Sequence, residues 1–292
     1  EEVGRATVVD GRTVGAEALL AQHRRATEED EAWRWSVMLW KARVRVAQTT
    51  GDVSLLDRAS AELLELGTEA AHLPTLRYAI ETRMVLEHTR QDWDTLLHHA
   101  RARLALDQGR PSADAAGLER WAVGLKRSVQ GDVEGALEAW AAGLAVTPER
   151  PRPDIMVRLA EARAQLLVTL SWAEDARAAV AVFERHARSA GEPAPLARAH
   201  VLEATVFRML GRPEAALNRI RRLAKEIPGE GQRGVDALVE LEMAHCHLAF
   251  GWHETAREHA AQAAELGKRD GEAVTTVRGR LAETLALIAM KM

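Results

Sequence analysis

The sequence predicts an all-α protein, an α-α superhelix of about six antiparallel helix pairs followed by a C-terminal capping helix. Three observations support this class. Alanine, leucine, glutamate and arginine dominate, and β-branched runs are nearly absent after residue 15. Apolar residues recur at spacings of three and four, and turn-forming pairs recur every 40 residues.

The turns define the helix pairs. Each turn follows about 18 residues of helical periodicity and precedes about 15 more, which is typical of an αα-hairpin. The six turns are Gly51-Asp52, Gln91-Asp92, Gly131-Asp132, Ser171-Trp172, Gly211-Arg212 and Gly251-Trp252. They give approximate repeats of 28-67, 68-107, 108-147, 148-187, 188-227 and 228-267 and a capping helix over 270-292.

The elements before the first repeat differ in pattern. Residues 1-13 contain a β-like run around Asp10-Gly11, which fits either a disordered arm or the remnant of an upstream domain. We expect the helical-repeat domain to cover 14-292, beginning with a short helix over 14-26. Thr27 and the acidic run Glu28 to Glu31 then predict the start of a second helix, where carboxylates oppose the positive end of the helix dipole.

Later elements carry their own signals. Gly124, Ala164, Ala204 and Ala244 each lie seven residues before a turn, where paired helices must approach closely. The proline-rich segment 148-153 predicts a bend, after which Asp154 is expected to cap a helix. Gly229, Gly231 and Gly234 fit a dinucleotide-binding pattern, but a helix and not a strand precedes them, so we interpret them as a turn between repeats.

Two segments resemble the second half of a tetratricopeptide repeat: GDVEGALEAWAAGLAVTP (131-148) and GRPEAALNRIRRLAKEIP (211-228). Gly131, Ala136, Trp140, Leu144 and Pro148 match that motif residue by residue. The usual period of that family is about 34 residues, whereas this chain uses 40. In this it resembles the long-period branch, the helical-repeat domain of maltose-regulator-type transcription activators.

The resemblance implies that the first helix of each pair lines a concave groove. The groove candidates are Arg45, Glu81, His88, Trp121, Arg158, Glu161, Gln165, Arg198, Arg208 and His245. It further implies a non-catalytic scaffold that binds a protein or peptide partner in bacterial signalling or regulation. This partner could be acidic. The alternative is the segment of a larger ATPase-linked transcriptional regulator that senses a small-molecule effector. An enzyme ranks third.

Composition restricts the function further. The net charge of −4 and pI of about 6.3 disfavour general nucleic-acid binding. Cys246 is the only cysteine, which excludes an intramolecular disulfide, and no apolar stretch is long enough to span a membrane, so we expect a cytoplasmic protein. No catalytic or cofactor-binding motif is found. His245, Cys246, His247 and His253 diverge on a helix, which argues against a metal site.

Two further groups of residues allow alternatives. We expect Trp93, Trp172 and Trp252, just after the turns, to pack in the core, and one of Trp33, Trp35 and Trp40 to mark a partner surface or to pack on helix 14-26. The fifth repeat is rich in arginine, which indicates either a solvated face or contacts to an anionic partner. Charge reversal of Arg158, Arg198 and Arg208 is expected to abolish binding while leaving the fold intact.

Overall fold

A computed structural model describes residues 14-107, 112-145, 151-226, 235-270 and 273-291. Within these ranges the chain forms 13 helices and no strand, which confirms the all-α prediction. The helices group into two compact units, Glu1–Arg110 and Pro111–Met292, and each is described by itself. The expectations for residues 1-13 and for Gly229, Gly231 and Gly234 lie outside the described residues.

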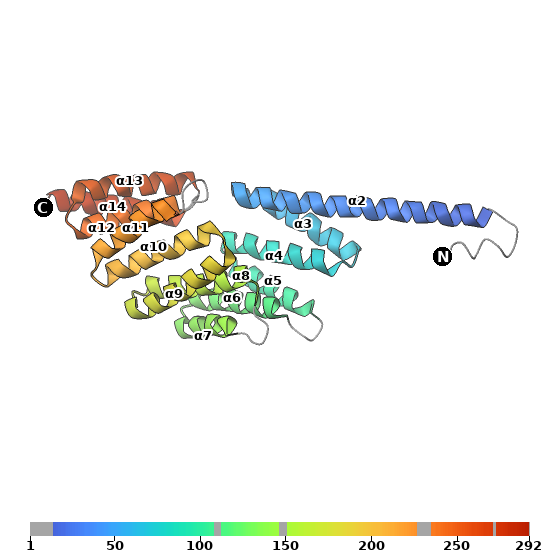
Figure 1. The fold of residues 1–292 in the computed structure, drawn as a ribbon, viewed down its shortest axis with the longest axis horizontal. Coiled ribbons are helices and arrows are strands. Elements are labelled where there is room, and N and C mark those ends of the chain that lie inside the picture. The colour runs from blue at the N-terminus through green and yellow to red at the C-terminus, as the bar shows by residue number, and fades with distance from the viewer. Residues whose placement is uncertain (1–13, 108–111, 146–150, 227–234, 271–272, 292) are drawn as a thin grey trace. The chain divides into compact units, whose positions relative to one another are not determined.

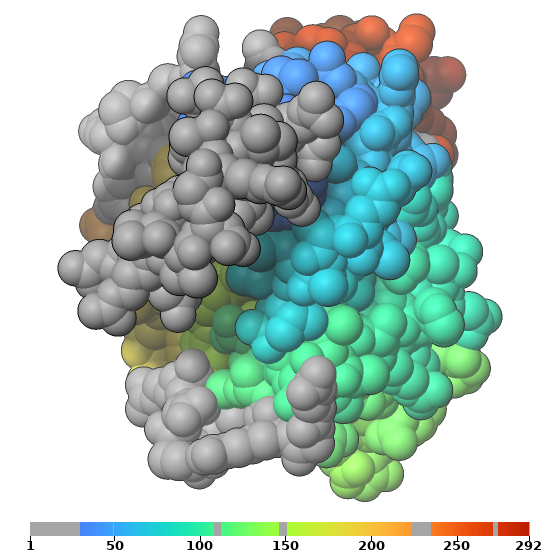
Figure 2. All heavy atoms as spheres, turned by 90° about the vertical axis from the view of Figure 1, so that its right-hand side faces the viewer, coloured from blue at the N-terminus to red at the C-terminus, as the bar shows by residue number. Residues whose placement is uncertain are grey.

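Over its described residues the first unit holds four helices: α2 (Val14–Thr50), α3 (Val53–Glu69), α4 (Leu73–Arg90) and α5 (Trp93–Ala105). Its core joins Val44, Leu63 and Leu86 from the first three of these helices. In the space-filling view the side chains of α3 and α4, in blue to cyan, lie against one another without a gap (Figure 2).

One expectation for this unit is wrong. Residues 14-50 form one helix, drawn as a single long rod in Figure 1, and not a short helix followed by another at Thr27. After Gly15 this stretch contains neither glycine nor proline, and glutamate and alanine favour helix, so nothing interrupts it. The acidic run Glu28 to Glu31 therefore lies within α2 and not at the start of a helix.

In the part of the second unit that the structure describes, the same alternation continues with nine helices, each packed against its neighbour in the chain (Figure 1). They are α6 (Ala113–Val129), α7 (Val133–Leu144), α8 (Pro153–Thr169), α9 (Ala173–Ala190), α10 (Pro193–Met209), α11 (Pro213–Glu226), α12 (Asp236–Ala249), α13 (His253–Arg269) and α14 (Ala273–Lys291). Together with α2 to α5 they make the six predicted pairs and the final helix.

The repeated turns share one backbone geometry. Their first residue has a positive φ in all six cases: 73° at Gly51, 59° at Gln91, 81° at Gly131, 59° at Ser171, 71° at Gly211 and 76° at Gly251. A left-handed residue ends a helix by turning the chain away from its axis. In the first three turns the next residue is an aspartate whose carboxylate accepts a hydrogen bond from the third backbone N–H of the following helix.

Close helix contacts occur where the small residues predicted them. A Cβ at Gly124 would lie 2.2 Å from Nε1 of Trp140, whose indole is buried and donates a hydrogen bond to the Trp121 carbonyl. Ala164, Ala204 and Ala244 are fully buried at the equivalent positions. Any larger residue there would force the paired helices apart.

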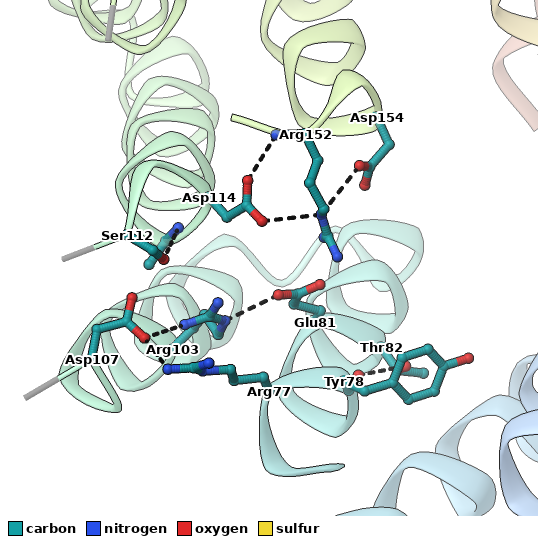
Figure 3. Close-up of polar contacts among 11 residues, drawn as sticks. Arg77, Tyr78, Glu81, Thr82, Arg103, Asp107, Ser112, Asp114, Arg152 and Asp154 are labelled. Carbon is teal, nitrogen blue, oxygen red and sulfur yellow. Dashed lines mark hydrogen bonds and ion pairs between the residues drawn. The ribbon is translucent and has the colours of Figure 1, made fainter. Parts of the chain in front are cut away.

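Three other expectations need correction. Trp172 and Trp252 are 47% and 52% exposed, because each is the first residue after the left-handed turn and lies at the end of its hairpin; Trp252 only stacks on His247 and Phe250 at the surface. Asp154 does not cap α8, which begins with Pro153 and has no side-chain cap. Instead Asp114 of α6 accepts a hydrogen bond of 2.7 Å from the Arg152 backbone N–H (Figure 3).

None of the described helices combines the length and the apolar character that crossing a bilayer requires.

Candidate functional site

A hollow of about 510 Å³ lies in the second unit between α8, α10, α12 and α14. Three of these are the first helices of their pairs, and the fourth is the final helix. On α10 the lining residues are Arg198, Val201, Leu202, Thr205 and Arg208, whose spacing of three and four places them on one face. The volume lies within the usual range of ligand sites, about 300 to 1,000 Å³.

The lining of this groove combines aliphatic and polar side chains. Aliphatic side chains come from every helix: Val168 from α8, Val201 and Leu202 from α10, Leu238 and Leu241 from α12, and Val274 from α14. These aliphatic side chains can bind apolar side chains of a ligand, while the polar groups of the lining orient the ligand.

The most buried charge in the groove is Glu242. Arg208 donates two hydrogen bonds to its carboxylate, from Nε at 2.7 Å and from Nη2 at 3.2 Å, and the Thr205 hydroxyl donates a third at 3.1 Å. Burial alone would raise the pKa of Glu242, but the nearby His245, whose Nδ1 lies 3.8 Å from the carboxylate, and the hydrogen bonds from Arg208 outweigh it and hold this pKa below its usual range. The carboxylate is therefore ionised and fixed at neutral pH.

A second bidentate pair joins α10 to α8. Arg198 donates from Nε and Nη2 to the two oxygens of Glu161, at 2.5 and 3.0 Å, and Gln165 donates to the same carboxylate at 3.2 Å. Planar guanidinium and carboxylate groups match in this geometry, so each pair fixes the lateral position of two neighbouring groove helices.

Arg278 of α14 differs from these two arginines. It is exposed, lines the groove, and makes no ion pair or hydrogen bond with any residue that the structure describes. Because Arg198 and Arg208 are each neutralised by a glutamate, the positive charge that the groove offers to a ligand comes from Arg278.

The structure brings together part of the predicted set. Gln165, Arg198, Arg208 and His245 line the groove, and Glu161 adjoins it through Arg198. Arg158 instead lies over the ring of Trp121, 5.2 Å from its centroid, and Trp121 itself is only 4% exposed. Trp121 is therefore a core residue beneath Arg158 and not an exposed groove residue.

The other three candidates belong to the first unit. Glu81 accepts a hydrogen bond of 3.0 Å from Nε of the buried Arg103, whose Nη1 also donates to Asp107 (Figure 3). His88 lies edge-on to Trp93, and Arg45 is on the exposed side of α2. Glu81 thus serves an internal ion network.

Sequence reasoning missed Glu242 and Arg278. The signal for Glu242 was available: Glu161 and Arg198 are 37 residues apart, as are Thr205 and Glu242, which is one helical turn less than the period of 40. Residues at that offset on successive first helices lie side by side. Arg278 was missed because the last helix was expected only to cap the array.

A second hollow, of about 430 Å³, lies between α9 and α10. Its acidic residues Glu184 and Glu203 already bind Arg219 of α11. These two carboxylates are thus already paired within the chain, and the groove between α8, α10, α12 and α14 is the candidate site. Among the described residues no group of three or more His, Cys, Asp or Glu side chains is arranged to hold a metal ion.

Comparison with known proteins gives matches at the level of structure. No family model and no curated protein sequence matches the chain. The apo form of the quorum sensor NprR from B. thuringiensis matches with a TM-score of 0.59 and 15% identity over 91% of this chain and 72% of that one. The chain has a tetratricopeptide-like helical-repeat fold.

Two further solved structures share this tetratricopeptide-like fold. A Rap protein complexed with Competence and Sporulation Factor matches with a TM-score of 0.55 and 10% identity, over 89% of this chain and 78% of that one. The apo form of RapI also matches with a TM-score of 0.55, at 12% identity, over 89% and 75% of the two chains.

Proposed function

We propose that the chain is a non-catalytic, cytoplasmic scaffold of bacterial signalling that binds a peptide in the groove between α8, α10, α12 and α14. The observation that carries this proposal is the groove itself, with aliphatic side chains from four helices, two internal Arg–Glu pairs and one arginine that no described residue neutralises. Two fold neighbours support it, one described as a quorum sensor and the other solved with Competence and Sporulation Factor.

The chemistry of the groove defines the peptide. Aliphatic side chains of a peptide can pack against Val201, Leu238 and Val274. A carboxylate, either of Asp or Glu or of the peptide C-terminus, pairs with Arg278, because guanidinium binds carboxylate in a bidentate manner.

This assignment revises the sequence-based hypothesis, in which Arg158, Arg198 and Arg208 were to bind the acidic group. Membership of the maltose-regulator-type branch rests on the 40-residue period alone.

The test uses two synthetic, fluorescein-labelled heptapeptide pools, one made of Leu, Val, Ser and Asp and the other of Leu, Val, Ser and Lys. Fluorescence anisotropy should report binding of the acidic pool and little of the basic pool. Arg278→Glu should abolish binding of the acidic pool, because it replaces the attracting charge by a repelling one. We expect a loss of at least about tenfold, since hydrogen bonds to charged groups contribute about 1.5 to 3 kcal/mol.

Arg222→Glu is the matched control, because Arg222 is an exposed arginine of α11 that does not line the groove. It should bind like the wild type. Failure of both pools to bind, or equal binding by Arg278→Glu and the wild type, would refute the groove as a site for acidic peptides.

A further inference from the structure

The final helix α14 docks through small residues. Thr275, Gly279, Ala282 and Ala286, spaced by four, three and four, are buried on the side that faces α13 and α12. A Cβ at Gly279 would lie 2.8 Å from the backbone nitrogen of Ala264. Glycine and alanine thus bring α14 very close to α13, and its large aliphatic residues lie on another face.

Those large residues form an exposed stripe. It consists of Val274, Val277, Leu281, Leu285 and Ile288, which are between 49% and 67% exposed. At 3.6 residues per turn they fall within about 80° of one another around the helix axis. Single exposed apolar residues are normal on a protein surface, but a continuous stripe marks a surface that another molecule covers.

The spacing within the stripe is symmetric. The steps are three, four, four and three residues, with Leu281 at the centre. When two such helices pair antiparallel about a two-fold axis, Val274 lies opposite Ile288, Val277 opposite Leu285, and Leu281 opposite itself. A surface that complements itself in this way is what an isologous dimer requires.

Charge also favours a second copy over a different partner. No charged residue lies on the stripe, so identical helices meet without repulsion. Arg280, which flanks it, already binds Glu265 and Glu283 of the same chain. Arg278 would lie opposite the neutral Thr284. Apart from Arg278, the flanks therefore offer little charge to attract an oppositely charged partner.

We propose that the exposed stripe of α14 is a homodimer interface, in which α14 of two chains packs antiparallel across a two-fold axis at Leu281. The stripe is about 21 Å long. A single helix pair of that length buries less than the roughly 800 Å² per partner of a standard interface, so the Kd should lie in the micromolar range. Val274 belongs to both the stripe and the groove, so Ile288 of the partner subunit lies beside the groove wall.

Sedimentation velocity over a series from about 1 to about 200 µM, which brackets this Kd, tests the proposal. The wild type should pass from monomer to dimer across the series. Leu281→Glu should remain monomeric, because two carboxylates would face each other on the axis. Leu287→Glu is the matched control: Leu287 is also a leucine of α14, 39% exposed, but lies off the stripe, so its variant should dimerise normally.

Two further variants test the antiparallel arrangement. Val277→Lys and Leu285→Glu should each weaken the dimer at least tenfold, whereas the double variant should regain it, because Lys then faces Glu twice. Leu281→Cys should form an intermolecular disulfide on mild oxidation, and Leu287→Cys should not. The native Cys246 is fully buried and should not contribute.

A wild type that stays monomeric throughout the series overturns the proposal and assigns the stripe to another occupant. Dimerisation of Leu281→Glu equal to that of the wild type places the interface elsewhere. A double variant that is no stronger than either single variant refutes the antiparallel pairing. None of these outcomes depends on whether the groove binds a peptide.

Discussion

At the scale of the residue, the groove depends on charges that the protein satisfies internally. Arg208 and Arg198 were expected to be free for a ligand, yet each holds a carboxylate from a neighbouring first helix. Composition reveals how many arginines a repeat contains, but not which acids of the adjacent repeats face them. The same limit applies to Trp172 and Trp252, where position after a turn did not predict exposure.

Arg208→Glu should therefore destabilise the protein, contrary to the expectation that charge reversal leaves the fold intact. Removing Arg208 leaves the buried carboxylate of Glu242 without its partner, and the new glutamate repels it. Loss of one member of a buried pair costs about 3 to 5 kcal/mol, and the partial exposure of Arg208 places this case near 3. Urea unfolding measures the change.

The pH dependence provides an internal check. Because the folded-state pKa of Glu242 is lowered, its contribution to stability is present above the unfolded-state pKa of about 4.3 and is lost as the pH falls through the folded value. The difference in the free energy of unfolding between wild type and Arg208→Glu should narrow below about pH 4. Arg222→Glu should stay within about 0.5 kcal/mol of wild type at neutral pH, and an equal loss in both variants would show that the pair is unimportant.

At the scale of the element, the hairpin turn was the best predicted feature of the chain. Its recurrence every 40 residues located the turn inside each helix pair, and the left-handed residue is found at all six positions. Glycine satisfies this geometry at four of them, whereas Gln91 and Ser171 adopt it despite their Cβ atoms. An L-residue other than glycine is disfavoured in this region by about 1 to 2 kcal/mol.

Replacing these two residues by glycine should thus stabilise the protein. Gln91→Gly and Ser171→Gly remove the strain at φ 59°, and the added freedom of the unfolded chain offsets part of the gain. We expect about 0.5 to 1 kcal/mol for each, measured by thermal or urea unfolding. Gln130→Gly is the opposite control. Gln130 has a φ of −78°, so glycine relieves no strain there and should lower the free energy of unfolding. A gain at Gln130 equal to that at Ser171 would show that strain is not the cause.

At the scale of the whole molecule, the 40-residue period predicted six helix pairs and a final helix. It did not predict that the final helix would line the groove. A repeat pattern shows which helices face each other along the chain, because neighbours share a core. It does not show that α14 adds Val274, Thr275 and Arg278 to the groove wall, since these residues follow the last turn and match no repeat position. The final helix therefore forms part of the candidate site.

Gly279→Leu should detach α14, and with it one side of the groove, while the other helices of the second unit stay folded. The added side chain would meet backbone atoms of Ala264 and Ala260 within 3.0 Å, and backbone cannot yield as a flexible side chain can, so α14 should leave α13. Repeat arrays couple mainly to nearest neighbours, so hydrogen exchange should accelerate in α13 and α14 while α6 to α9 keep their protection. Binding of the acidic peptide pool should be lost, because α14 carries Arg278.

Thr284→Leu is the control, a similar enlargement on the exposed side of the same helix. It should change neither hydrogen exchange nor peptide binding. Uniform loss of protection across the second unit would show that it unfolds as one cooperative block, and unchanged exchange in α14 would show that the small-residue face does not hold the final helix in place.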